Sequence, residues 1–141
     1  MPDLKLFIID ENTGRFRLGL PSPPETVEGI DLLVQIVAML FLNNGGRSIF
    51  QPGRSGGLRR YIGQNFDQED PSELFADFRL ITNRIEQIIK EEQVLIGRPA
   101  SERLQSLQLV DIVPDEDQAE IELIVSVVNE EQQQQQAIVA V

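Results

Sequence analysis

The sequence predicts an α+β fold in which three helices pack on a small antiparallel sheet. Three observations lead to this prediction. A very apolar segment spans residues 30–42, a long amphipathic segment follows Pro71, and two segments at 104–113 and 119–128 contain strand-forming residues around a turn. A chain of 141 residues is long enough for one hydrophobic core. We further expect a hairpin before the helices and an extended arm after the sheet.

The composition argues against an enzyme. The chain has no Cys and no His, which excludes thiol nucleophiles, disulfides, histidine general bases and most zinc sites. No catalytic residue, cofactor site or metal site is therefore predicted. The formal net charge of -11 argues against nonspecific nucleic-acid binding. The apolar segment is too short to cross a membrane, and no signal peptide is recognisable at the N-terminus.

Residues 1–24 are expected to form a separate N-terminal unit. Two strand-like runs between Leu4 and Leu20 flank a turn at Gly14, and their apolar residues alternate, as in a hairpin with one apolar face. The proline-rich segment 21–24 then interrupts the pattern. We interpret the hairpin as an appendage on a stiff linker.

The next segment, 25–43, predicts a helix that is apolar nearly all round. Between residues 30 and 42 only Asp31 and Gln35 are polar, and Glu25 and Glu28 lie near the expected start, where the helix dipole favours negative charge. Such a helix must be covered on more than one side. Two interpretations stay open, full burial within the monomer and coverage of one side by a partner protein.

Residues 45–61 form a glycine-rich and arginine-rich corner between two helical segments. Arg47, Arg54, Arg59 and Arg60 lie here without one acidic residue, in a strongly acidic chain. A short second helix is expected at 57–66. The corner could contact phosphate through Arg and backbone N–H groups, although such loops are more often turns with exposed charge.

The long amphipathic helix has the clearest local signal. Asp70 is the expected N-cap, Pro71 the first helical residue, and Glu73 completes a start that is similar to a capping box. The helix is expected to end before Gly97. Its inward stripe repeats at spacings of four and three and comprises Leu74, Phe78, Ile81, Ile85 and Ile88.

The two strands that follow enclose an acidic turn at 114–117, which we interpret as solvated rather than metal-binding. The chain then ends in a glutamine-rich tether, 131–141, with a short apolar run at its end. We interpret this run as a free strand that adds to the sheet of a neighbour. Removal of residues 132–141 is expected to leave a folded monomer that no longer adds this strand to a neighbour.

The order of these parts resembles the baseplate wedge family of contractile-tailed bacteriophages. These proteins are the sheath initiators, and relatives occur in type VI secretion baseplates. The resemblance covers about residues 27–129. In that family the first helix runs into a glycine, arginine and proline corner, and a Glu-Pro-Arg motif precedes the first strand of the later hairpin. Ser101-Glu102-Arg103 stands at the place of that motif. The matching corner residues are Gly45, Arg47, Ile49, Phe50, Pro52 and Leu58.

The resemblance implies a structural protein that docks on the helical core of the wedge and nucleates sheath assembly by strand exchange with the first sheath ring. Its implied partners are the tail sheath protein and other wedge proteins, with tube or hub proteins as further candidates, and it implies six copies per baseplate. The implied location is the virion tail, with the host cytoplasm during assembly. The expected division is 1–24 hairpin, 25–130 initiator domain and 131–141 tether.

The resemblance and the residue patterns together assign assembly contacts to ten residues. The alternative function is a stand-alone protein- or nucleic-acid-binding adaptor that uses the loop 45–61. The ten residues are Arg47, Pro52, Leu58, Arg59, Arg60, Glu102, Arg103, Ile138, Val139 and Val141.

Overall fold

A computed structural model describes residues 3–9, 16–42, 71–115 and 120–140 of the chain. The predicted short helix at 57–66 lies outside these residues. So do the glycine-rich corner, the cap residue Asp70 and the second half of the acidic turn, residues 116–117.

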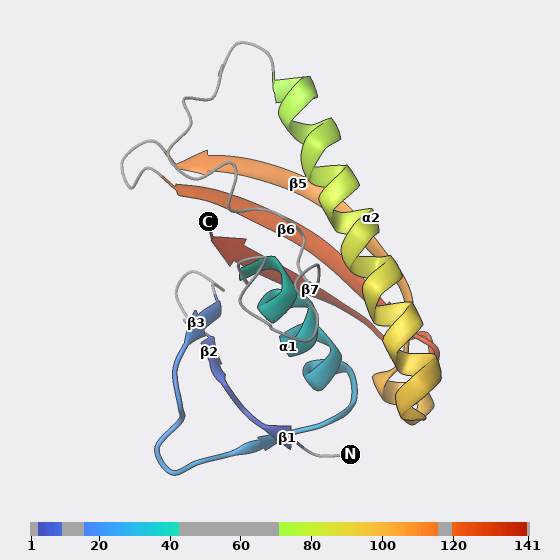
Figure 1. Ribbon diagram of the computed structural model, residues 1–141. Coiled ribbons are helices and arrows are strands. Elements are labelled where there is room, and N and C mark those ends of the chain that lie inside the picture. Colours follow the sequence, from blue (N-terminus) through green and yellow to red (C-terminus); the bar gives the residue numbers. More distant parts are fainter. Residues whose placement is uncertain (1–2, 10–15, 43–70, 116–119, 141) are drawn as a thin grey trace, which may run out of the picture.

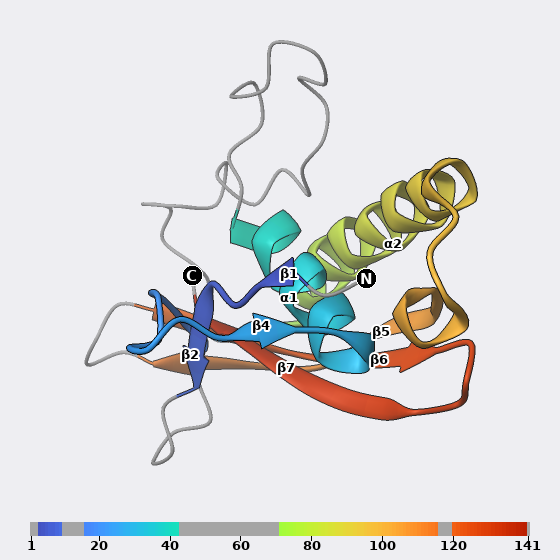
Figure 2. The ribbon, with the colours of Figure 1, turned by 90° about the horizontal axis from the view of Figure 1, so that it is seen from below.

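The described residues confirm the α+β class. They contain two α-helices, α1 (Gly29–Leu42) and α2 (Pro71–Ile96), and a short 3-10 helix, η2 (Ala100–Glu102). The main sheet has three antiparallel strands in the order β5-β6-β7, and both helices lie over one of its faces (Figures 1 and 2). The strands are β5 (Leu104–Asp115), β6 (Glu120–Asn129) and β7 (Gln134–Ala140).

Helix α2 follows the prediction closely. It starts at Pro71 and its inward stripe is buried at Phe78, Ile81 and Ile85. It ends where Gly97 adopts a positive φ of 69° and donates its N–H to the carbonyl oxygen of Gln93 at 3.3 Å. Glycine enters this left-handed conformation without the steric cost that a side chain would add.

The alternation predicted for the second strand is confirmed in β6. Its inward residues, Ile121, Leu123, Val125 and Val127, belong to the core. The prediction for the C-terminal segment was wrong, because residues 134–140 form β7 and pair with β6 in the same chain. A free tether would leave Ala137 and Val139 in water, whereas β7 buries both of them.

The N-terminal hairpin is confirmed, but it is not an appendage. Strand β2 (Phe7–Ile9) pairs with β3 (Phe16–Leu18), and β1 (Asp3–Leu4) pairs with β4 (Thr26–Val27). Phe7 is buried in the same core as α1 and the main sheet. The hairpin therefore contributes to the one core that the described residues share.

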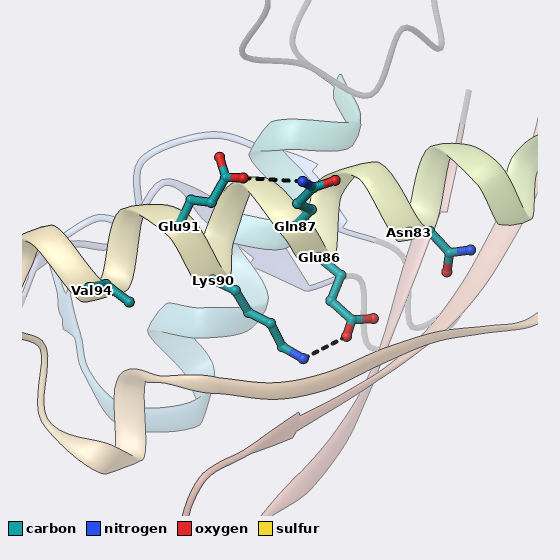
Figure 3. Close-up of a pocket in the computed structure, with 6 residues that line it drawn as sticks. All are labelled: Asn83, Glu86, Gln87, Lys90, Glu91 and Val94. Atoms are coloured by element: carbon teal, nitrogen blue, oxygen red, sulfur yellow. Dashed lines mark hydrogen bonds and ion pairs between the residues drawn. The ribbon is translucent and has the colours of Figure 1, made fainter.

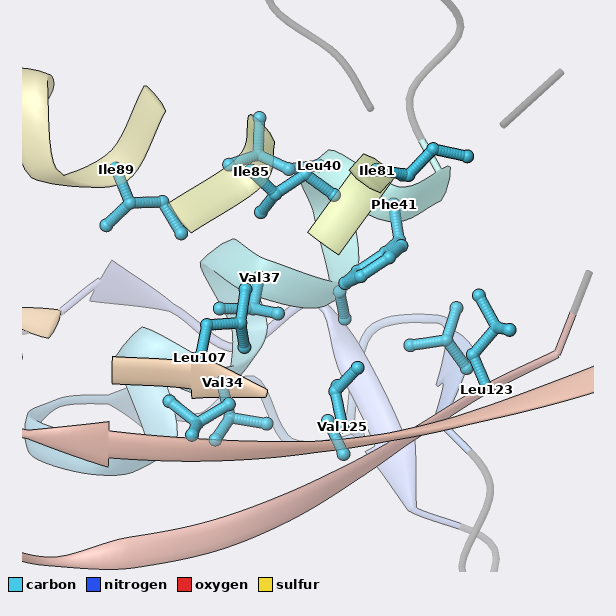
Figure 4. Packing of buried hydrophobic residues seen from close by; sticks show 14 of the residues in the cluster. Val34, Val37, Leu40, Phe41, Ile81, Ile85, Ile89, Leu107, Leu123 and Val125 are labelled. Carbon is cyan, nitrogen blue, oxygen red and sulfur yellow. The ribbon is translucent and has the colours of Figure 1, made fainter. Parts of the chain in front are cut away.

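Helix α1 is buried by its own chain, so burial within the monomer is the correct interpretation of its apolar surface. Figure 4 shows Val37 and Phe41 of α1 between the isoleucines of α2 and the β6 residues Leu123 and Val125. On another side, buried Gln35 bonds the N-terminal backbone, accepting from Leu6 N at 2.9 Å and donating to the carbonyl oxygen of Leu4 at 3.1 Å.

Candidate assembly surfaces

The turn at Ser101-Glu102-Arg103 connects α2 to the main sheet. Glu102 is only 1% exposed, and its Oε1 atom accepts the N–H of Gly29, the first residue of α1, at 3.5 Å. Its Oε2 atom lies 4.0 Å from the guanidinium of Arg98. Glu102 therefore supplies a negative carboxylate to the N-terminus of α1, in addition to Asp31 in the first turn of the helix.

Arg103 ties the same turn to the end of β6. Its Nε atom lies 2.8 Å from the carboxylate of Glu130, and its carbonyl oxygen accepts the N–H of Glu130 at 2.9 Å. Glu102 is thus buried and bonded to Gly29, whereas Arg103 lies at the surface and pairs with Glu130 of the same chain. The assembly role of both residues stays a prediction.

An open hollow of about 450 Å³ lies beside this turn. Its lining includes Glu28, Glu102 and Glu131, so its character is acidic. Among the described residues no group of acidic side chains is arranged to hold a metal ion.

The predicted C-terminal contact residues have two different environments. Val139 points into the core opposite Leu123, whereas Ile138 is half-buried on the outer face of the sheet opposite Ile124. Val139 therefore stabilises the fold. Of the two residues, Ile138 is accessible to a partner on the outer face of the sheet. Val141 lies outside the described residues.

The edge strand β5 has a covered part and an open part. Side chains of α2 form hydrogen bonds with the first residues of β5. The side-chain amide of Gln93 accepts the N–H of Leu104 at 2.8 Å and donates to the carbonyl oxygen of Leu104 at 3.2 Å. Glu86 accepts the N–H of Leu107 at 3.4 Å. Beyond Leu107 the strand continues to Asp115, with Val110 and Val113 exposed.

Sequence patterns missed these two valines. A break in the alternation of apolar and polar residues could have indicated them. The inward residues of β5 are Leu107, Leu109 and Ile112, whereas Val110 and Val113 are apolar residues at outward-facing positions. The register shift between Leu109 and Asp111 makes Val110 the extra residue of a β-bulge, and a bulge moves the later residues to the opposite phase.

A second missed surface is the outer side of α2. Figure 3 shows Gln87 and Glu91 on the side of the helix that faces away from β5, joined by a 3.1 Å hydrogen bond. Lys90 and Glu86 are 2.8 Å apart and turn toward β5. Val94 and Leu95 are 81% and 86% exposed at the end of the helix. They fall outside the inward stripe that the spacing of apolar residues predicts for this helix.

Five of the ten predicted contact residues lie in the corner 45–61, outside the described residues. The alternative adaptor function, which depends on this loop, therefore stays a prediction. The five residues are Arg47, Pro52, Leu58, Arg59 and Arg60.

A comparison with protein-family models, with curated proteins and with solved structures returns no significant match. Within the described part of the chain, neither helix has the length and apolar character needed to span a membrane.

Proposed function

We propose that the chain is a structural component of a contractile-tail baseplate that nucleates the sheath by pairing its main sheet with a strand of the first sheath ring. The resemblance in the corner 45–61 and in the order of helices and strands motivates the proposal. The observation that carries it is the open part of β5, an edge strand with exposed Val110 and Val113.

This edge suits an extended partner segment. An edge strand presents backbone N–H and C=O groups that an incoming strand can bond, and side chains on its faces then select the partner. The bonds from Gln93 and Glu86 close the first part of β5, so they direct a partner toward residues 108–115. The sheet acts as the acceptor in this mechanism, because β7 is already paired in its own chain.

The edge also has features that restrict pairing. The bulge at Val110 interrupts the regular ladder, and the side chain of Asp111 accepts the N–H of Ile112 at 2.8 Å. Bulges and charged side chains protect natural edge strands from indiscriminate association. A partner strand must therefore match the bulge and displace the hydrogen bond between Asp111 and Ile112. These two requirements make the small sheet selective for one partner segment.

The proposed partners are the tail sheath protein and the wedge proteins, with tube or hub proteins as further candidates, in six copies per baseplate. The proposed location is the virion tail, reached from the host cytoplasm during assembly. The chain would act by assembly and not by catalysis.

Co-expression with the tail sheath subunit of the same phage or secretion system tests the proposal. We expect wild-type chain to capture the sheath subunit, and the double variant Val110→Lys, Val113→Lys to lose capture, because lysine on an edge strand opposes pairing. The matched control is Leu20→Lys, Met39→Lys, which places the same charges on exposed positions outside β5 and α2. Capture of sheath by the β5 variant at the wild-type level would contradict the edge mechanism.

A further inference from the structure

The backbone of β5 presents only some of its residues to the open edge of the sheet. In an antiparallel sheet, successive residues direct their N–H and C=O groups alternately toward the neighbouring strand and away from it. Leu104 faces the open edge, because its N–H and C=O groups bond the side chain of Gln93 in α2. Leu107 faces it as well, because its N–H bonds Glu86. The register with β6 is regular from Leu107 to Leu109, so Leu109 faces the same edge.

Beyond Leu109 the bulge changes which residues face the edge. The extra residue Val110 shifts the alternation by one position, so Ile112 and Pro114 face the open edge in the last part of β5. The N–H of Ile112 already bonds the side chain of Asp111 at 2.8 Å. Pro114 has no N–H group. The edge-facing N–H groups beyond the bulge are therefore occupied or absent.

Leu109 differs from these edge-facing residues. Within the described part of the chain, no hydrogen bond to a side chain occupies its N–H, and its C=O group points to the same side of the strand. The side chain of Leu109 packs against the core, which holds its backbone in place. Its neighbours Gln108 and Val110 are exposed. Leu109 thus offers both a donor and an acceptor at a fixed position of the edge.

We propose that Leu109 is the backbone anchor at which a partner strand first pairs with β5, and that Gln93 and Glu86 are stops that fix the register of this strand. The inference rests on the proposed function, since the partner strand is the segment of the sheath subunit that pairs with β5. The side-chain amide of Gln93 accepts and donates as a strand residue would, so it already occupies Leu104. An added strand therefore begins at Leu109 and continues toward Asp115.

The anchor also defines the chemistry of the partner segment. Side chains alternate along a strand, so the partner residue that pairs with Leu109 shares its inner face, and the adjacent partner residues lie on the outer face. Val110 and Val113 are exposed on that outer face. We expect the partner segment to have apolar residues at its outer-face positions, because apolar contacts between neighbouring strands stabilise a sheet.

Amide hydrogen exchange of the full chain, followed residue by residue by NMR, tests the anchor without a partner. We expect the Leu109 amide to exchange at least about tenfold faster than that of Gln108, whose N–H faces β6. Glu86→Ala should accelerate exchange at Leu107, whereas Glu86→Gln, which keeps an acceptor oxygen, should not. Glu91→Ala is the matched control, since Glu91 lies on the side of α2 that faces away from β5.

Addition of the sheath subunit then tests the register. Binding should slow exchange at Leu109 at least about tenfold, because its N–H gains a partner in the added strand. Exchange at Leu104 should stay unchanged, because Gln93 already holds this residue. In the Glu86→Ala variant, binding should slow exchange at Leu107 as well, since one stop has been removed.

Three results would overturn the inference. They are a free chain in which Leu109 exchanges as slowly as Gln108, a Glu86→Ala variant with unchanged exchange at Leu107, and a bound sheath subunit that leaves exchange at Leu109 unchanged. Absence of binding by the sheath subunit would contradict the proposed function instead. The exchange rates of the free chain would then still decide whether Leu109 is the open position of the edge.

Discussion

Glu102 joins three segments that are distant in the sequence. Its carboxylate faces the first N–H of α1, lies near Arg98 and comes from the turn that leads into β5. Replacement of this buried carboxylate is expected to lower the free energy of unfolding, because the N–H of Gly29 and the guanidinium of Arg98 lose a charged acceptor. The turn therefore stabilises the fold by connecting α1, the segment that follows α2 and the start of β5.

Replacing Glu102 by Gln is expected to lower the free energy of unfolding by about 1–3 kcal/mol, because the charged acceptor becomes neutral while the side chain keeps its size. Chemical denaturation measures the change. Glu131→Gln, an exposed change in the neighbouring turn, serves as the control and should have little effect. Equal effects of the two substitutions would show that Glu102 has no special structural role.

Gln35 has the corresponding role on the other side of α1. Replacing it by Leu keeps the volume but leaves Leu6 N–H and Leu4 C=O without their amide partner, at an expected cost of about 1–3 kcal/mol. Hydrogen exchange at the Leu6 amide should accelerate more than the global loss of stability explains. The same exchange rate as in Gln136→Leu, on the exposed side of β7, would argue that the contact is not formed in solution.

At the scale of elements, β7 is an integral strand of the sheet. Removal of residues 132–141 leaves the edge of β6 that pairs with β7 without a partner strand and takes Ala137 and Val139 out of the core. We expect the truncated chain to lose cooperative unfolding, in contrast to the folded domain that the sequence alone predicted. Thermal unfolding followed by circular dichroism checks this.

A milder change tests the same strand without deleting it. Val139→Ala should cost about 2 kcal/mol, from the lost burial of the side chain and the cavity it leaves. Gln136→Ala, on the outward side of the same strand, should change stability by less than about 0.5 kcal/mol. A truncated chain as stable as the full chain, or equal effects of the two substitutions, would refute the placement of β7.

Local patterns predicted the elements whose signals are local. The inward stripe and the glycine stop of α2, and the alternation of β6, depend on neighbouring residues and were predictable. The pairing of β7 with β6 was not predictable, because the five glutamines at 132–136 suggest a polar tether. In the structure the last three of them, Gln134, Gln135 and Gln136, belong to β7 instead, and Gln134 donates to the hydroxyl of Ser126 at 2.8 Å.

Long-range contacts decided the candidate site. Glu102 bonds Gly29 across a sequence separation of 73 residues, which no spacing rule reaches. The coverage of α1 also could not be deduced, since its apolar surface suits an internal core and a partner equally well. The exposed valines of β5 became visible only with the bulge at Val110, which depends on the register with β6.

At the scale of the whole molecule, the core explains how so acidic a chain presents selective surfaces. The hairpin, α1, α2 and the main sheet bury one shared cluster, which holds the edge strand β5 in place. A net charge of -11 keeps the free chain soluble and opposes nonspecific association. In the proposed function, contacts with partners then depend on shape, backbone pairing and local charge.

The location of the chain in assembled tails tests the central claim most directly. Contractile tails purified from cells that encode the chain would be labelled with gold-conjugated antibody against it and imaged by electron microscopy. The account predicts label at the baseplate end of the tail, beneath the first sheath ring. Tails that carry no label, or label spread along the whole sheath, would contradict it.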